Sequence, residues 1–198
     1  TLKIKTLYMQ HAGVTKYFPP LEFDYALLDG MIAHQTYIKC YQIQKKNKRI
    51  ERNIKKCQIF LSGQKKKFQI KNFNNNKKKT IGIATGTLDN FQYLKPIINN
   101  VLKLGLNCDI RFHPAQPASF ISKIEEYSKN MKYLKLSYPK KESLSIFFSK
   151  VDAVIAFRTS LHLEAAIAGL PTFFIKMFRT NFKSDSYGYV ESGLSFKL

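Results

Sequence analysis

The feature that most constrains the fold is an alternation, from residue 80 onward, of short apolar runs with amphipathic stretches. Five runs have the length and the apolar content of buried strands: 80–85, 107–112, 132–137, 152–157 and 171–176. Each gap between them carries a stretch with helical spacing, an order typical of βαβ units. The sequence therefore predicts an α/β fold with an open, twisted, Rossmann-like parallel sheet and right-handed crossovers.

The helical stretch after the first of these runs shows its periodicity most clearly. Apolar residues from Phe91 to Leu102 recur three and four positions apart. Asp89 stands where a helix cap belongs, and Gly105 stands where the helix is expected to end. Three further helices are expected at 118–129, 142–149 and 160–168.

The amino-terminal third of the chain has a different pattern. Short strands are expected at 5–10, 24–28 and 57–62, with a polar helix after Gly30. We interpret residues 1–63 as the remnant of a second α/β domain, 64–79 as a basic linker or loop without periodicity, and 80–198 as the Rossmann-like domain. The chain enters its first strand soon after Thr1 without a signal segment, so we expect a fragment that lacks an amino-terminal part.

The positive charge of the chain is concentrated in one segment. The formal net charge is +20, and residues 39–79 hold 15 Lys and Arg against the single acid Glu51. Such clusters attract phosphates, nucleic acid or an anionic membrane surface. Lysines make up 28 of the 33 basic residues, whereas proteins that read bases use bidentate arginines. We expect an anionic membrane surface as partner, or a plainly solvated face, and no specific nucleic acid.

The cysteines and the apolar runs restrict where the protein works. Cys40, Cys57 and Cys108 are odd in number and form no CxxC motif, which argues against a disulfide framework and a zinc site and fits a reducing cytosol. No apolar run reaches the roughly 18 residues of a membrane span. The sequence therefore predicts a cytoplasmic protein, peripheral on the inner face of the membrane if it binds there.

Ligands of open α/β sheets bind beyond the carboxyl ends of the strands, so the residues that follow each strand are the first candidates. Thr85 and Gly86 follow the first strand, where backbone amides can hold an anion, although an ordinary turn has the same composition. The second strand ends at Arg111 and leads to His113. An imidazole there can donate a hydrogen bond to a phosphate oxygen or neutralise charge on a leaving group.

The fourth strand leads through Arg158 into Thr159 and Ser160, at the start of a helix. Hydroxyls and free amides at a helix amino terminus favour phosphate. Glu164 lies one turn further on the face of Ser160, where a carboxylate suits sugar hydroxyls. The alternative is that Thr159 or Ser160 caps the helix and Glu164 is solvated. His162 falls on another face, as packing or surface.

Near the amino terminus, His11 directly follows a strand. A neutral imidazole is a natural general base for deprotonating a hydroxyl. Asp29 has two interpretations: support for His11 or a base of its own, or, as the pair Asp29-Gly30 favours, a turn or helix cap.

Together these residues resemble a known family, the two-domain GT-B glycosyltransferases, in their carboxyl-terminal part. The motifs are LYMQHAG at 7–13, HP at 113–114 and T-S-x-x-x-E-A-A-x-A-G-x-P at 159–171. They are most similar to the bacterial surface-polysaccharide group with polysialyltransferase-like, capsule-assembly and CDP-glycerol glycerophosphotransferase-like enzymes. The resemblance covers most of 80–198 and about 1–30.

The resemblance implies roles for the residues that match the motifs. It implies that His113 contacts the donor phosphate and aids departure of the leaving group. It also implies that Thr159 and Ser160 hold phosphate oxygens, and that Glu164 contacts the ribose or the sugar of the donor.

The resemblance likewise implies that His11 is a base that activates the acceptor. Here the sequence departs from the family's pattern, because Ala12 stands between His11 and Gly13.

The expected activity is transfer of a sugar from a nucleotide-activated donor to a bacterial surface glycan or glycolipid, such as capsule or lipooligosaccharide. No cofactor is expected. The chain contains no DxD motif, so we expect a metal-free donor site in which His113, helix amides and Arg111 or Arg158 meet the charge of the leaving nucleotide. The alternatives are a sugar-nucleotide epimerase or hydrolase of the same fold, or a non-catalytic module that binds an anionic polymer or membrane through 39–79.

Overall fold

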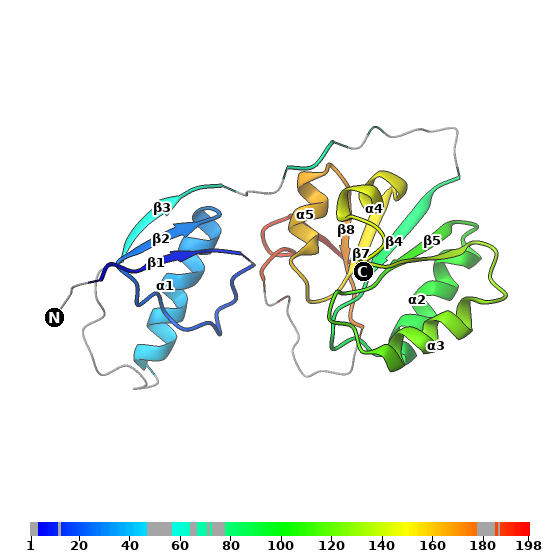
Figure 1. Ribbon diagram of the computed structural model, residues 1–198, viewed down its shortest axis with the longest axis horizontal. Coiled ribbons are helices and arrows are strands. Elements are labelled where there is room, and N and C mark those ends of the chain that lie inside the picture. The colour runs from blue at the N-terminus through cyan, green and yellow to red at the C-terminus, as the bar shows by residue number, and fades with distance from the viewer. Residues whose placement is uncertain are drawn as a thin grey trace. The chain divides into compact units, whose positions relative to one another are not determined.

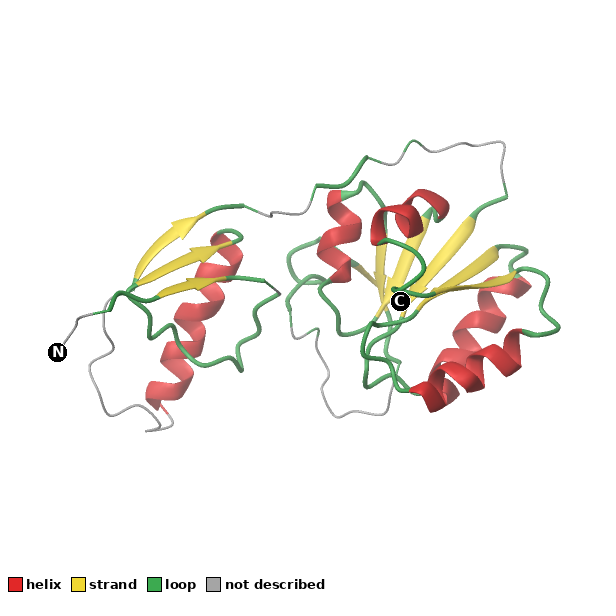
Figure 2. Cartoon of the chain, in the orientation of Figure 1, coloured by secondary structure: helices red, strands yellow, loops and turns green. Residues whose placement is uncertain are grey.

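The computed structural model divides the chain into two compact units, residues 1–67 and 68–198 (Figures 1 and 2). It describes residues 4–11, 13–46, 57–63, 67–70, 72, 78–177, 185 and 187–198. Residues 64–66, 71 and 73–77 of the predicted linker, and residues 47–56 of the basic segment, therefore lie outside the described residues.

The second unit contains one six-stranded sheet in which every neighbouring pair of strands is parallel. Its strands are β4 (Thr80–Ala84), β5 (Asn107–Arg111), β6 (Leu134–Ser137), β7 (Ala153–Ala156), β8 (Thr172–Phe174) and β9 (Phe196–Lys197). They lie in the order β6-β5-β4-β7-β8-β9, which is the strand order of the dinucleotide-binding Rossmann fold. The predicted Rossmann-like parallel sheet is confirmed.

Helices cover this sheet on both faces (Figure 1). They are α2 (Phe91–Lys103), α3 (Ala118–Ser128), α4 (Leu144–Lys150) and α5 (Leu161–Ile167). The first two pack on one face in a core with Ile83 and Ile110, and the last two pack on the other face with Ala84 and Val154. Alternate residues of the strands therefore enter two separate cores, as a two-sided sheet requires.

A glycine allows α4 to lie close to the sheet. A Cβ atom on Gly82 in β4 would stand 2.7 Å from Cζ of Phe147 and 3.1 Å from Cγ1 of Val151. Phe147 is fully buried. The ring of Phe147 thus occupies the space that any side chain at position 82 would need.

The ends of α2 correct one prediction and agree with another. The cap is Asn90, whose side chain accepts a hydrogen bond from the Gln92 amide, and not Asp89. Gly105 follows the helix with a φ of +75°, a conformation that glycine adopts without strain.

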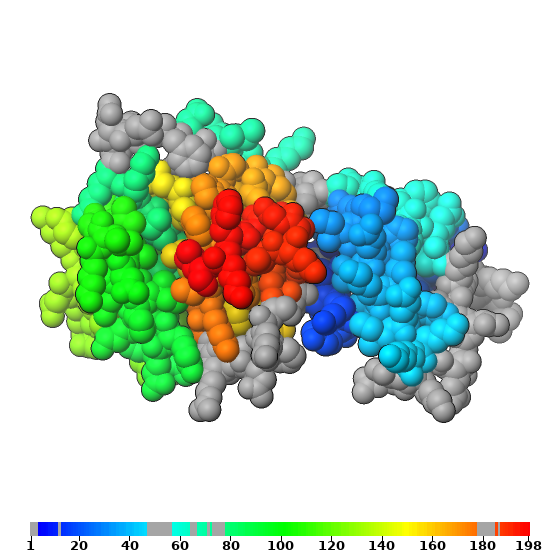
Figure 3. Space-filling model, turned by 180° about the vertical axis from the view of Figure 1, so that it is seen from behind, coloured from blue at the N-terminus to red at the C-terminus, as the bar shows by residue number. Residues whose placement is uncertain are grey.

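The carboxyl-terminal strand β9 was not predicted from the sequence. It has two residues and pairs with β8, while the Phe196 ring packs 5.7 Å from that of Phe173. Figure 3 shows this last segment at the surface of the second unit, against the segment that contains β8. Its identity as a strand comes from that pairing rather than from its own pattern.

The described residues of the first unit form three parallel strands and one helix (Figure 2). The elements are β1 (Leu7–Met9), β2 (Tyr25–Leu28), α1 (Met31–Lys46) and β3 (Gln58–Leu61), with the strands in the order β1-β2-β3. The core is formed by buried residues of β2, of the segment between β1 and β2, and of α1: Val14, Leu21, Ala26, Leu28, Ala33, Tyr37 and Cys40. The alternate positions Leu7, Met9 and Phe60 are 53%, 45% and 46% exposed.

Two further observations concern the expected compartment. All three cysteines are free thiols. Among the described residues, no helix combines the length and the apolar character that crossing a bilayer requires.

Candidate functional site

The candidate site of the second unit is the edge of the sheet where its strands end. β5 and β6, which follow β4 in the chain, lie on one side of β4 in the sheet, and β7 lies on its other side. The strand order therefore reverses between β4 and β7. Such a switch point is where ligands of open α/β sheets bind, because the loops that leave the two strands diverge there.

Thr85 ties the loop after β4 to the loop after β5. Its amide donates to the Arg111 carbonyl at 2.9 Å, and its hydroxyl accepts from the His113 amide at 3.3 Å and reaches Oε1 of Gln116 at 3.0 Å. The side chain is buried. Thr85 therefore lies beside His113, but its hydroxyl is engaged within the fold.

The His113 ring is partly exposed at this edge. Its Nδ1 accepts a hydrogen bond from the Ala115 amide at 3.1 Å. In the neutral ring the proton is consequently on Nε2. The structure leaves that nitrogen as the donor that a phosphate oxygen requires.

Gly86 joins the loop after β4 to the loop after β7. A Cβ at this position would be 3.9 Å from the Arg158 carbonyl oxygen, so the two loops are in van der Waals range. The Gly86 amide already donates to Oδ2 of Asp89 at 2.7 Å. The predicted anion-holding role therefore has to rely on other amides of this edge.

Asp89 is a buried carboxylate that the sequence indicated only as a cap. Burial raises its pKa from 3.8 to about 6, and the hydrogen bond from Gly86 opposes part of that rise. Its position beside Gly86 makes it a positioning group for the loop. The sequence signal was an acid three residues after a glycine in a strand-to-helix turn.

The helix that follows β7 begins with the predicted hydroxyls. Thr159 Oγ1 accepts from the Leu161 amide at 3.2 Å, so Thr159 contributes to capping. Ser160 occupies the N-cap position, is partly exposed, and makes no capping hydrogen bond through its side chain. Glu164 lies in the first turn and is 9% exposed. Because Thr159 supplies the capping hydrogen bond, the Ser160 hydroxyl is the better candidate for a contact with a ligand.

His162 serves the packing of this helix. The ring is fully buried, with Nε2 3.0 Å from the Phe157 carbonyl and Nδ1 3.2 Å from the Ser195 hydroxyl. Burial lowers its pKa. The predicted packing role agrees with this environment.

The two candidate arginines lie in different environments. The Arg111 side chain is buried, donates to the Ser137 hydroxyl at 2.8 Å and lies 5.9 Å from the centre of the Phe147 ring. It therefore points to the sheet face under α4 instead of the ligand edge, because residue 111 alternates with the buried positions 110 and 112. Arg158 stays at the edge, partly exposed, near Tyr187, where its charge opposes the rise in the Tyr187 pKa that burial causes.

In the first unit, His11 is exposed just after β1. The neighbouring Gln10 accepts from the Asp29 amide at 2.9 Å through its side chain and donates to the Leu27 carbonyl at 3.0 Å through its backbone. The loops after β1 and β2 are thereby joined, and they bring His11 and Asp29 to the same edge of the small sheet.

Within the ranges that the structure describes, no three His, Cys, Asp or Glu side chains gather as metal ligands do.

Comparison with known proteins gives similarity in structure but not in sequence. No protein-family model and no curated protein matches the chain. The pneumococcal O-GlcNAc transferase GtfA, in complex with UDP and GlcNAc, is 16% identical with a TM-score of 0.51, over 80% of this chain and 31% of that one. TarM is 11% identical with a TM-score of 0.52, over 98% of this chain and 40% of that one.

A third similar structure is the UDP-GlcNAc 2-epimerase of Methanocaldococcus jannaschii, in complex with UDP-GlcNAc and UDP. It is 14% identical with a TM-score of 0.55, over 89% of this chain and 50% of that one. The chain thus spans between about a third and a half of the length of these proteins. At such identities the likeness establishes the architecture alone: the chain has an α/β fold of the Rossmann-like GT-B type.

Proposed function

We propose that this chain is part of a glycosyltransferase that binds a nucleotide-activated sugar at the carboxyl edge of the β4–β9 sheet. The observation that carries the proposal is the union of three loops at the switch point, with Thr85 bonded to His113 and Gly86 in van der Waals range of Arg158. Support comes from two proteins of similar fold whose structures contain UDP, GtfA and the epimerase.

The proposed chemistry follows from the groups at that edge. Negative charge grows on the nucleotide phosphate as the sugar departs, and donors aimed at that charge lower the barrier. Nε2 of His113 is one such donor, and the Ser160 hydroxyl is a second. The Glu164 carboxylate would accept hydrogen bonds from ribose or sugar hydroxyls.

The remaining parts of the proposal concern the other substrate and the location. His11 would be the base that deprotonates the acceptor, a bacterial surface glycan or glycolipid. The donor site would work without a metal ion, with the Nε2 proton of His113 and the positive charge of Arg158 meeting the charge of the leaving nucleotide. Residues 39–79 would hold the protein on the anionic inner face of the membrane.

The test is donor binding and turnover by two variants with matched controls. His113→Ala and Ser160→Ala should each weaken binding or turnover by roughly ten-fold or more, the effect of losing a charge-assisted hydrogen bond. The controls are His34→Ala, a partly exposed histidine of α1, and Ser119→Ala, an exposed serine of α3. Binding is measured by ligand-observed NMR with CMP, CDP, UDP and GDP, and transfer with a labelled sugar nucleotide.

Full turnover by a folded His113→Ala variant would remove the proposed mechanism. Failure of the wild-type chain to bind any of the four nucleotides would instead favour the non-catalytic basic module, whose binding to anionic vesicles should fall steeply with salt.

The second candidate is an epimerase or hydrolase, supported by the similarity to UDP-GlcNAc 2-epimerase. The two activities differ in their need for an acceptor. Conversion of a labelled sugar nucleotide without acceptor favours the epimerase or hydrolase, whereas conversion that depends on added glycan favours the transferase.

A further inference from the structure

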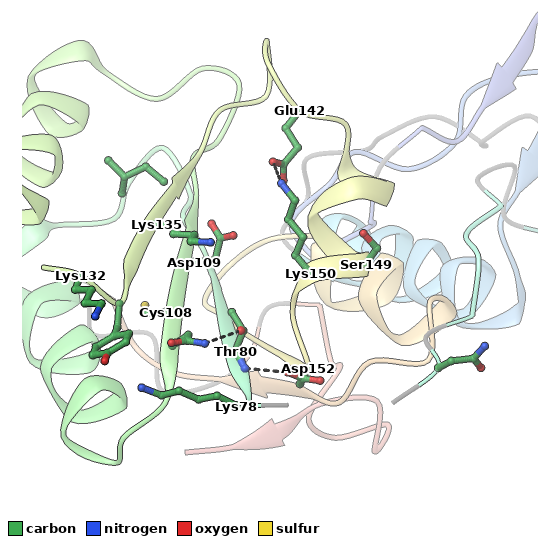
Figure 4. A pocket seen from close by; sticks show the side chains of 14 residues that line it. Lys78, Thr80, Cys108, Asp109, Lys132, Lys135, Glu142, Ser149, Lys150 and Asp152 are labelled. Atoms are coloured by element: carbon green, nitrogen blue, oxygen red, sulfur yellow. Dashed lines mark hydrogen bonds and ion pairs between the residues drawn. The ribbon is translucent and has the colours of Figure 1, made fainter. Parts of the chain in front are cut away.

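The second unit contains a pocket that shares no residue with the edge described above. It has a volume of about 740 Å³ and lies over β5 and β6, near the ends where the strands begin (Figure 4). Asp109 and Lys135 line it from the sheet, and Glu142 and Lys150 line it from the segment that contains α4. Asp109 and Lys135 project from the face opposite α2 and α3, because those helices pack on the alternate strand positions 108, 110 and 134.

The pocket exists because α4 covers only the middle of that face. The Phe147 ring is held over Gly82 in β4, one strand away from β5. A longer helix would cover β5 and β6 and would require apolar side chains beneath it. At that place the sheet instead carries the register partners Asp109 and Lys135. The sequence of these strands is thus apolar toward α2 and α3 and charged toward the pocket.

Asp109 is the residue that points to a ligand. It is 5% exposed, and its Oδ1 has no hydrogen-bond partner within the part of the chain that the structure describes. A buried carboxylate oxygen without a partner costs stability, and such groups are rare unless they serve a purpose. Burial together with the nearby Glu142 raises its pKa, which Lys150 and Lys135 oppose.

The other charges of the pocket are largely engaged. Lys150 is paired with Glu142, and the Asp152 carboxylate accepts from the Thr80 amide at 2.8 Å. Lys78 lies 3.6 Å from the centre of the Tyr133 ring. Figure 4 shows Asp109 and Lys135 side by side, across from the Glu142–Lys150 pair.

From this arrangement we propose that the pocket binds a small sugar that carries one acidic group, either a phosphate or a carboxylate. Asp109 accepts hydrogen bonds from sugar hydroxyls, and Lys135, with Lys132 at the rim, neutralises the acidic group. A polyanion such as nucleic acid is disfavoured because the Asp109 carboxylate would repel a second phosphate. The volume falls in the range of pockets for ligands of this size.

The test uses the full chain with four probes: glucose 6-phosphate, glucuronate, glucose and inorganic phosphate. Titration followed by amide NMR should show one or both acidic sugars shifting the resonances of residues 109, 133 and 135, and binding more tightly than glucose or phosphate. The two acidic sugars tell a phosphate ligand from a carboxylate ligand.

Three variants decide whether the pocket is responsible. Asp109→Leu keeps the branching and the number of side-chain heavy atoms but removes both carboxylate acceptors, and should weaken binding by roughly ten-fold or more. Lys135→Ala, at an exposed position that does not threaten folding, should weaken it several-fold, while Lys103→Ala on α2 should leave it unchanged. Removing an unpartnered buried carboxylate should leave the melting temperature of the Leu variant equal or higher.

The proposal is overturned if inorganic phosphate binds as tightly as the acidic sugars, if Asp109→Leu binds as well as the wild type, or if no probe binds at millimolar concentration. It is also overturned if acidic-sugar binding is lost in His113→Ala and kept in Asp109→Leu, since the ligand would then occupy the carboxyl edge. Binding of nucleotides to the Asp109→Leu variant is the separate readout of the proposed function.

Discussion

The two parallel sheets of this protein differ in what their uncovered surface is made of. The uncovered face of the first sheet is apolar, with Leu7, Met9 and Phe60 each close to half exposed. The patch of the second sheet beyond α4 is charged, with the buried Asp109 and the exposed Lys135 as register partners on β5 and β6. Parallel strands are normally buried on both faces. The first sheet therefore exposes apolar side chains that suit a covering layer. The second sheet instead carries charged side chains, which suit water or a polar ligand, in the region beyond its helices.

The largest expected effect contrasts one phenylalanine from each sheet region. Phe147→Ala removes a fully buried ring and should lower the free energy of unfolding of the second unit by about 3–5 kcal/mol. Phe60→Ala, at a position 46% exposed, should cost less than about 1 kcal/mol. Denaturant unfolding of both variants measures the difference, and equal losses would show that the β1–β3 face is covered after all.

The next effect concerns buried carboxylates. Asp89 has a pKa of about 6, above its ordinary value of 3.8, so the folded state binds the extra proton. Its contribution to stability is full below pH 4 and is lost as the pH rises through 6, by at most about 3 kcal/mol. Asp109 adds to the change in the same direction. Asp89→Asn should flatten the fall in stability between pH 4 and pH 6.

The control for this pH effect lies in the first unit. Asp24 accepts hydrogen bonds from the amide and the hydroxyl of Thr6 at 2.9 and 3.0 Å. These hydrogen bonds stabilise its charged form. Asp24→Asn should leave the decline between pH 4 and pH 6 in place. If the decline in stability survived Asp89→Asn and disappeared in Asp24→Asn, it would arise from the first unit and the prediction would be wrong.

The smallest effect compares two glycines. Gly82→Ala forces the Phe147 ring and Val151 to move and should destabilise by about 1–3 kcal/mol. Gly30→Ala meets no atom within 4 Å and should stay within about 0.5 kcal/mol. Thermal melting of the pair measures this. A neutral Gly82→Ala would mean that α4 is not tightly seated on β4.

The sequence predicted the elements better than it predicted their ends and faces. The periodicity of α2 and the apolar run of β4 come from local patterns that burial on both sides of the sheet imposes. The cap of α2 at Asn90 could not be chosen from residue type, because Asp89 and Asn90 are equally good caps; in the structure the Asp89 side chain instead accepts from the Gly86 amide, three residues earlier.

The candidate site was predictable to the level of the loops. Strand ends placed His113 and Ser160 at one edge, because all strands of the sheet run in the same direction. The direction of the Arg111 side chain follows from the alternation of the strand, since the apolar residues 110 and 112 face α2 and α3 and residue 111 must therefore face α4. Its position at the strand end alone suggested the ligand edge instead. The pocket at Asp109 was not predicted from the sequence. It depends on how far α4 extends over the sheet, and no local pattern specifies that length.

The strand order has a consequence for how the protein is made. β4 is the first strand of its sheet in the chain and lies between β5 and β7 in space. During synthesis from the amino end, its β7-facing edge must wait until the ribosome has delivered the whole of β5, α3, β6 and α4. Through that interval the nascent polypeptide presents an unpaired apolar ribbon, which makes this stage the one at which a chaperone has most to protect.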